Sequence, residues 1–204
     1  MTPSRSSDNH AAPCPERPLW PFLLAGLGLI AAQALVLYAM GRTPICTCDT
    51  IRLWVGNVRS SENSQQLFDW YTLSHILHGF VFYLVLCLLF PRKSFGARLL
   101  MAIAIEVSWE IVENTNLVID RYRAETISLH YYGDSILNSV TDTLAATAGF
   151  IVAHRAPVAL VVAAALAVEI GMAFWIRDNL TLNVLMLLYP IDAIQHWQNA
   201  LAPK

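Results

Sequence analysis

The clearest pattern in the sequence is a series of long apolar runs separated by shorter polar segments. Five of these runs are long enough to cross the roughly 30 Å hydrocarbon core of a bilayer as helices. The pattern predicts spanning helices at Leu19–Met40, Tyr71–Phe90, Ala97 to about Leu117, Tyr132–Ala153 and Ala156–Ile176.

The C-terminal segment follows a different pattern. After Arg177 and Asp178, the apolar stretch Leu180–Tyr189 is too short to cross a bilayer, and Pro190 interrupts its continuation. Apolar side chains then recur at roughly helical spacing at Ile191, Ile194, Trp197 and Leu201. We expect a short interfacial or re-entrant helix in this segment, with a sixth, broken span as the alternative.

These elements define the expected fold class. It is all-α: a polytopic membrane helix bundle of five spanning helices plus a short C-terminal interfacial or re-entrant helix. A polar N-terminal tail over residues 1–18 precedes a single membrane-embedded helical domain over residues 19–204. The apolar region of a cleaved signal peptide would be about 7 to 15 residues, shorter than the first run, so we interpret that run as a spanning helix.

Composition and charge agree with a membrane protein. Hydrophobic residues make up 56% of the chain and charged residues only 14%, well below the charged share of a soluble domain. A formal net charge of -2 also lacks the basic surface that nucleic-acid binding needs. The expected partner is therefore the lipid bilayer, and no nucleic acid.

The distribution of basic residues predicts the orientation. The numbers of Lys and Arg residues on the two sides of the membrane are nearly equal. The loop Pro91–Arg98, however, contains Arg92, Lys93 and Arg98 close together and no acidic residue. Short loops rich in Lys and Arg stay in the cytoplasm. We therefore expect a cytoplasmic N-terminus, with the loops Gly41–Trp70 and Val118–Tyr131 and the C-terminal tail outside.

The third run carries three carboxylates on one helical face. Glu106, Glu110 and Glu113 are spaced i, i+4 and i+7, which at about 100° per residue places them within an arc of about 60°. A charged side chain inside a span costs about 3 kcal/mol even on lenient scales, so such residues usually face a cavity or a partner. We expect this acidic face to point into the bundle.

The fourth run carries a second polar face. Asp134, Asn138 and Asp142 step by four along it, and the small residues Ala146 and Gly149 follow, which suits close contact between helices. His75 and His78 lie near the start of the second run, in the same outer half of the membrane. We expect one shared cavity with its mouth beside the loop Val118–Tyr131, formed by Glu110, Asn138, Asp142, His75 and His78.

Imidazole and carboxylate groups suit acid–base chemistry. The catalytic candidates are His75, Glu110, Asp142 and Asn138. The candidates for substrate binding are Arg123, Asp134, His78 and Glu113, with Arg123 holding an anionic headgroup. Solvation at the membrane surface is the alternative for Glu113, Asp134 and His75, and a structural hydrogen-bond network is the alternative for Glu110, Asn138 and Asp142.

The cofactor is left open, with a divalent metal as one option. Carboxylates and histidines together can ligate metals, but neither an HExxH motif nor a paired ExxH motif is present. Cys46 and Cys48 are expected on the outer side, where a Cys-x-Cys pair binds a metal or exchanges disulfides if it is functional. Their redox state is left open, and Cys14 and Cys87 carry no expected function.

A family of small bacterial multi-pass membrane proteins of unknown function resembles this chain over most of its length. The resemblance is carried by the segments CDTIRLWVGNVRSSENSQQLFDWYTLSHILHG, WEIVENTN, IDRYR and YYGDSILNSVTD. It implies a location in the bacterial inner membrane and does not imply a reaction.

The chain is also similar, more remotely, to VanZ-like membrane proteins, which are associated with the cell envelope and glycopeptide-antibiotic tolerance. The matching positions are Asp69, His75, Glu110, Arg123, Asp134 and Asn138. Two positions depart from that pattern: Asp142 stands where it tends to have Gly, and Glu113 adds an acid.

Three functions are compatible with these patterns. The first is an enzyme acting on an envelope lipid or lipid-linked substrate, with His75 or Glu110 as general base or metal ligand. The second is a proton-coupled transporter, although the polar positions fade in the inner half and no inverted repeat is evident. The third is a membrane scaffold or assembly factor, in which the polar residues only lock helices together.

Overall fold

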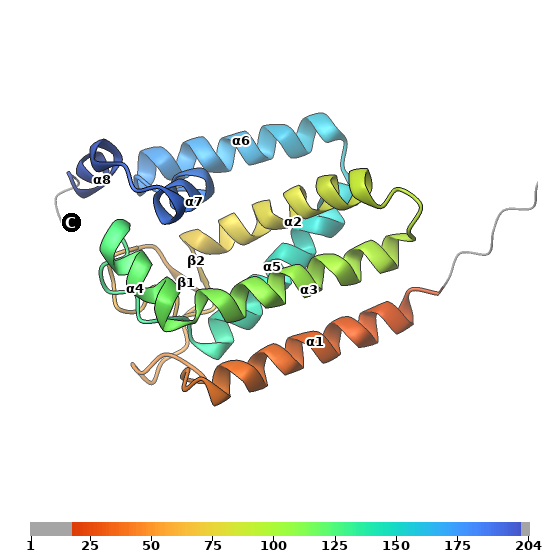
Figure 1. Cartoon of the computed structure of the whole chain (residues 1–204), viewed down its shortest axis with the longest axis horizontal. Coiled ribbons are helices and arrows are strands. Elements are labelled where there is room, and N and C mark those ends of the chain that lie inside the picture. The colour runs from red at the N-terminus through yellow and green to blue at the C-terminus, as the bar shows by residue number, and fades with distance from the viewer. Residues whose placement is uncertain (1–17, 201–204) are drawn as a thin grey trace, which may run out of the picture.

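The computed structural model describes residues 18–200 and is mostly helical (Figure 1). Arg5, Cys14 and the rest of the predicted tail before Pro18, together with Leu201, lie outside these residues. Eight helices form within the described range: α1 Trp20–Ala39, α2 Trp70–Leu89, α3 Phe95–Glu113, α4 Asn116–Glu125, α5 Ile136–Arg155, α6 Val158–Trp175, α7 Leu180–Leu188 and α8 Asp192–Asn199.

The long helices form a bundle with two different ends. Helices α1, α2, α3 and α6 run side by side along the long axis, and α5 packs among them (Figure 1). Residues 41–69 and 114–135 gather at one end, which we call the loop end. The short connections 90–94 and 156–157 lie at the other, which we call the turn end.

Four helices, α1, α2, α5 and α6, are long and apolar enough to cross a membrane, out of the five spans expected. Helix α3 has 19 residues, a similar length, but it is not among the four. Its carboxylates and Arg98 lower its apolar character within the same length.

Two predicted helix boundaries were wrong. The third run was expected to continue to about Leu117, but α3 ends at Glu113 and the separate helix α4 occupies much of the loop Val118–Tyr131. The fourth was expected from Tyr132, but α5 starts at Ile136. There Ser135 caps the helix by accepting a hydrogen bond from the Asn138 backbone N–H. Asp134 therefore precedes the helix.

The all-α expectation needs one small correction at the loop end. Strand β1 (Trp54–Val55) pairs in parallel with β2 (Phe68–Asp69) inside the expected loop Gly41–Trp70. Asp69 ends this sheet and caps α2, because its side chain accepts hydrogen bonds from the backbone N–H groups of Tyr71 and Thr72. The sheet thus fixes where α2 begins, five residues before His75.

Helices α2 and α5 cross where both carry glycine. A Cβ at Gly79 would collide with backbone atoms of Ala146 and Phe150, and a Cβ at Gly149 would collide with the Ile76 backbone. The close contact expected from Ala146 and Gly149 is therefore present. The apolar core lies nearer the turn end and includes Leu86, Leu99, Ala102, Ile103, Val107 and Phe150. Polar buried groups concentrate between this core and the loop end.

Candidate functional site

His75 of α2 lies at the centre of the polar groups. Its Nδ1 is 2.5 Å from Glu106 Oε1 and 3.3 Å from Glu110 Oε1, both on α3. Its Nε2 is 3.9 Å from Asp142 Oδ2 on α5. One buried imidazole therefore separates Glu110 from Asp142, and the two predicted polar faces meet at it.

Glu106 is shared by both histidines. His78 lies one turn after His75, and its Nδ1 is 3.2 and 3.1 Å from the two carboxylate oxygens of Glu106. Glu106 is 1% exposed. It was recognised as part of the acidic face but was not chosen as a site residue, although its spacing with Glu110 and Glu113 was a usable signal.

Glu110 is also joined to α5 and α1. Ser139 donates a 2.6 Å hydrogen bond to Glu110 Oε2 and accepts one from Gln33 Nε2 at 2.8 Å. Thr143 donates to Gln33 Oε1 at 2.9 Å. The polar residue that interrupts the first apolar run thus binds two hydroxyls of α5. Gln33, Ser139 and Thr143 were not among the residues predicted to form the site.

Asp134 is buried, 7% exposed, rather than placed on a helix face at the surface. Its Oδ2 accepts hydrogen bonds from Asn114 Nδ2 at 2.7 Å and from the Tyr131 hydroxyl at 3.1 Å. Burial raises the pKa of Asp134 to about 6, although the hydrogen bonds from Asn114 and Tyr131 oppose that rise.

A small cavity lies beside this cluster, and we call it the polar cavity. Its volume is about 50 Å³, room for a few water molecules. Of the predicted residues, those that line it are His75, His78, Glu113, Asp134 and Asp142. Helix α4 contributes Tyr122, and α7 contributes Leu180, Asn183 and Val184. The cavity therefore touches the loop Val118–Tyr131, as expected, and also α7.

Tyrosines supply hydroxyl groups that the sequence analysis did not single out. Tyr71, Tyr122 and Tyr131 all line the polar cavity. Burial, together with the nearby charges of Glu113 and Asp134, raises the pKa values of Tyr122 and Tyr131 well above the usual tyrosine range. Both hydroxyls therefore stay protonated at neutral pH and remain hydrogen-bond donors.

Three candidates do not line the polar cavity. Glu110 contacts His75 and Ser139 behind it. Asn138 donates instead to the Gln66 carbonyl oxygen at 2.9 Å, because the segment before β2 packs over the first turn of α5. Arg123 pairs with Asp120, three residues earlier on α4, at 2.9 Å and lies over the Tyr132 ring. The expected direction of Asn138 was wrong, and the role of Arg123 in binding an anionic headgroup stays a prediction.

An apolar groove adjoins the polar cavity between α3, α4 and α7. Its volume is about 550 Å³. Its apolar lining includes Leu117, Val118, Leu187 and Leu188, and Arg121 and Glu125 are among its charged residues. Trp109 and Val184 line both spaces, so the groove and the polar cavity share a wall.

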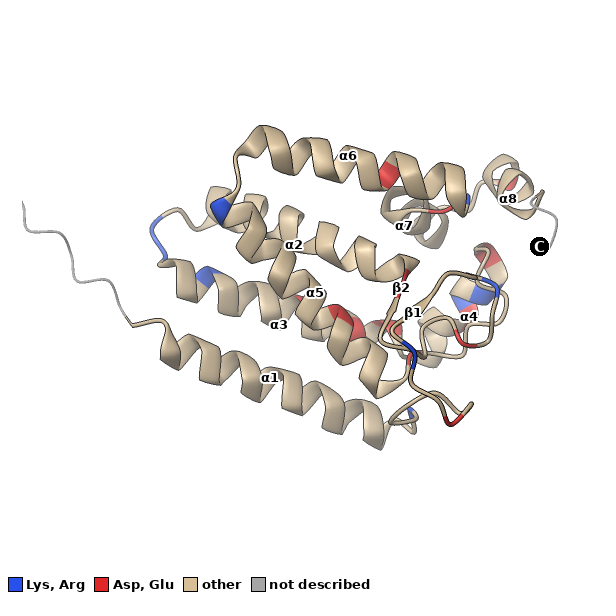
Figure 2. Ribbon diagram, turned by 180° about the vertical axis from the view of Figure 1, so that it is seen from behind, with Lys and Arg blue, Asp and Glu red and all other residues tan. Residues whose placement is uncertain are grey.

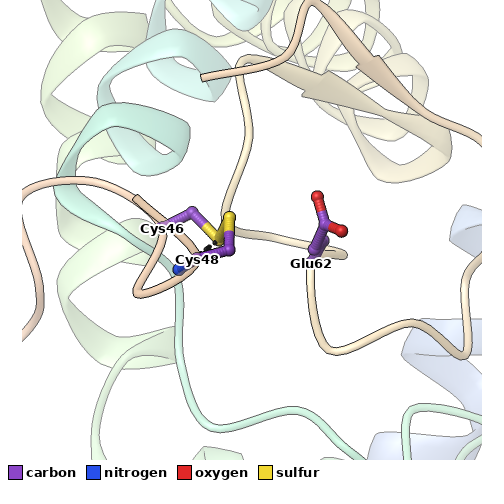
Figure 3. A group of neighbouring side chains, drawn as sticks. All are labelled: Cys46, Cys48 and Glu62. Carbon is purple, nitrogen blue, oxygen red and sulfur yellow. Dashed lines mark hydrogen bonds between the residues drawn. A yellow bond between two sulfur atoms is a disulfide. The ribbon is translucent and has the colours of Figure 1, made fainter. Parts of the chain in front are cut away.

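Cys46 and Cys48 form a disulfide in the loop-end segment (Figure 3). Glu62 lies next to them, and Gln66 Nε2 donates to both Cys48 Sγ and Glu62 Oε2. The three residues could hold a metal only as thiolates plus carboxylate. In the disulfide state the sulfurs are bonded to each other, so this structure represents the oxidised alternative.

Comparison with known proteins places the chain in a family. Residues 37–200 match the family model described as "Protein of unknown function (DUF2585)". A UPF0314 protein of Rhizobium meliloti (strain 1021) is 58% identical over 180 residues, covering 88% of this chain and 90% of its own. A UPF0314 protein of Sinorhizobium fredii is 54% identical over 201 residues, covering 98% and 100%. No solved structure matches. The chain therefore belongs to the DUF2585 family and is one of the bacterial UPF0314 proteins.

Proposed function

We propose that this protein is a multi-pass protein of the bacterial inner membrane whose polar cavity acts on an envelope lipid or a lipid-linked substrate. One observation carries the proposal: the cavity at His75 and the apolar groove share Trp109 and Val184. A lipid chain in the groove would bring its polar end to the buried carboxylates. The resemblance to VanZ-like proteins points to the same cell envelope.

In this proposal α3 is the fifth span. Glu106 and Glu110 are each 1% exposed, so its carboxylates face the bundle and do not meet lipid. Helix α7 is re-entrant, since Glu169 of α6 accepts hydrogen bonds from the first backbone N–H groups of α7, at Leu180 and Thr181. Glu169 lies six residues before the end of α6, so α7 begins roughly 9 Å below that end.

The polar cavity and the apolar groove differ in size, so each accommodates a different part of the substrate. The polar cavity admits water or one small polar group, whereas the groove accommodates a chain. His75 and Asp142 line the cavity and are placed to exchange protons with that polar group, and Glu110 acts through His75. His78, Glu113 and Asp134 are placed to bind the group. Arg121 lines the groove, so it takes the role of binding an anionic headgroup that was assigned to Arg123.

Transport through the bundle is less compatible with this geometry. Between the cavity and the turn end lies the buried apolar core around Leu99, Ile103 and Phe150. A proton or ion path toward that end would need polar groups or water across this core. If the protein functions without the cavity residues, the scaffold role is the function that is left.

The lipid proposal predicts a loss of function when two carboxylates become amides. In Rhizobium meliloti lacking its UPF0314 protein, we expect this chain to restore the lipid composition altered by the deletion. Glu110→Gln and Asp142→Asn should restore it at least about 100-fold more slowly, because an amide side chain cannot act as a general acid or base near neutral pH. The measurement is lipid mass spectrometry at equal protein levels in the membrane.

Asp192→Asn is the matched control, because Asp192 is exposed at the start of α8 and lines neither the polar cavity nor the apolar groove. It should restore the lipids like the parent chain. Full restoration by both cavity variants, or a deletion strain with unchanged lipids, would remove support for the enzyme.

The orientation proposal can be tested separately. At the turn end, the described residues include Arg92, Lys93, Arg98 and Arg155 and no acid (Figure 2). The positive-inside rule then places this end in the cytoplasm and the disulfide outside.

In spheroplasts treated with a mild reductant, we expect an impermeant maleimide to label the parent chain. A variant with serine at positions 46 and 48 should not be labelled. Labelling of the parent chain only after lysis would reverse the orientation.

A further inference from the structure

We propose that His75, His78 and Glu106 bind a divalent first-row transition-metal ion such as Zn²⁺. One ligand atom from each, an imidazole nitrogen of each histidine and a carboxylate oxygen, lies within 4.8 Å of the others. The proposal concerns the same cavity as the proposed function and deepens it, since a metal ion would place a Lewis acid beside the groove. It does not depend on the identity of the substrate.

The ligand set comes from two helices. His75 and His78 are spaced i, i+3, which places both on one face of α2, and Glu106 faces them from α3. The two Glu106 oxygens are 3.2 and 3.1 Å from His78 Nδ1, near the spacing of about 3.4 Å between ligand atoms around a tetrahedral Zn²⁺. Sequence motifs such as HExxH miss this arrangement because the carboxylate is on another helix.

The local charge balance favours a cation. Among the described residues, the ion pairs of Glu106, Glu110 and Asp142 are with His75 and His78 alone. Burying several carboxylates against two imidazoles is costly unless further positive charge compensates them. A divalent ion bound between the helices would supply that charge.

A second observation points into the same space. Glu110 Oε1, Asp142 Oδ1 and Ser74 Oγ are buried oxygens without a hydrogen-bond partner in the described part of the chain. The three residues are 1%, 4% and 6% exposed, and Asp142 and Ser74 line the polar cavity. Buried polar atoms are rarely left without hydrogen-bond partners. Water molecules that complete the coordination of a metal ion would donate hydrogen bonds to these oxygens.

The neighbouring side chains orient the ligands. His75 Nε2 faces Asp142 at 3.9 Å, the side from which carboxylates commonly hold a metal-bound histidine. The His78 ring stacks on Phe82 with centroids 5.7 Å apart and meets the edge of Trp109. Nitrogen ligands with a carboxylate favour Zn²⁺ and related ions over Mg²⁺ or Ca²⁺, which prefer oxygen ligands alone.

Metal content gives the direct test. We expect the full chain, purified without tag or chelator in detergent, to carry close to one equivalent of a first-row divalent metal by plasma mass spectrometry. His78→Ala and Glu106→Ala should retain less than a tenth of that amount. His154→Ala is the control, since His154 contacts Tyr83 at the turn end, and it should retain the full amount.

A spectroscopic test covers the case in which a ligand variant folds poorly. Chelator-treated parent protein titrated with Co²⁺ should develop the visible absorption of a four- or five-coordinate site at one equivalent. His78→Cys should keep Co²⁺ and add a sulfur-to-cobalt charge-transfer band. A parent chain that takes up less than a tenth of an equivalent of Zn²⁺ or Co²⁺ would overturn the proposal, as would full metal content in both alanine variants.

The two proposals can fail independently. Metal at one equivalent with unchanged lipids in the deletion strain would leave the metal site and remove the lipid function. Lipids that depend on Glu110 and Asp142 in a chain without metal would leave the function and remove the metal site.

Discussion

Replacing Gly79 with alanine is expected to lower the free energy of unfolding by about 3 kcal/mol, the upper end of the usual cost of overpacking. A Cβ at this position would come closer than 3.0 Å to backbone atoms of Ala146, Gly149 and Phe150. Backbone atoms cannot rotate away as a side chain can, so α2 must move away from α5. Chemical unfolding in detergent, followed by circular dichroism, measures the change.

Gly28→Ala is the matched control for this prediction. Gly28 is also within a long helix, but no atom outside its local backbone lies within 4 Å of a Cβ built there. We expect it to leave stability unchanged or raised by up to about 1 kcal/mol, the helix preference of alanine over glycine. Equal stability of the two variants would mean that the helix crossing is not tightly packed.

The second prediction concerns Asp178, which joins three helices. Its carboxylate is fully buried and accepts hydrogen bonds from the Tyr71 hydroxyl at 2.9 Å, Gln198 Nε2 at 3.2 Å and Asn183 Nδ2 at 3.3 Å. These partners belong to α2, α8 and α7. Burial raises the pKa of Asp178 to about 6, the nearby charge of Glu169 on α6 adds to the rise, and the hydrogen bonds from Tyr71 and Asn183 oppose it.

The sign of the pH effect follows from this pKa. Because the pKa in the folded protein is above the ordinary value of 3.8, the folded state holds the proton more tightly than the unfolded state. The stabilisation is complete below about pH 4 and is lost as the pH rises through about 6, by on the order of 3 kcal/mol for a shift of roughly two units.

Asp178→Asn should therefore remove this part of the pH dependence. The midpoint of thermal unfolding of the parent chain should fall relative to the variant between pH 4 and pH 7. Asp192→Asn, at an exposed position at the start of α8, should follow the parent chain. Parallel curves for the parent chain and Asp178→Asn would show that Asp178 does not titrate in this range.

The helices themselves could be predicted from the sequence because their determinants are local. Long apolar runs located α1, α2, α5 and α6, since backbone groups away from water must be satisfied within a helix. The ends of the helices were predicted less accurately. Asn114 and Ser135 set the boundaries of α3 and α5 through contacts with Asp134 and the Asn138 backbone N–H, which a hydropathy pattern does not report.

The meeting of His75, Glu110 and Asp142 was also predictable in outline. Charged residues at helical spacing must face one another when lipid surrounds the bundle, so periodicity alone brought the two polar faces together. Which atoms meet depends on how each helix is rotated about its axis. That rotation placed Glu106 between the two histidines and turned Asn138 toward Gln66, and neither result follows from spacing.

The sequence by itself determined where the long apolar helices lie and that polar groups on three helices share the interior, because both follow from the cost of exposing polar groups to lipid. Only the tertiary structure decided the partners that are far apart in sequence. Gln33 binds Ser139, Tyr71 binds Asp178, and the groove runs between α3, α4 and α7. These contacts depend on the packing of helices and loops from distant parts of the chain, and no local pattern encodes that packing.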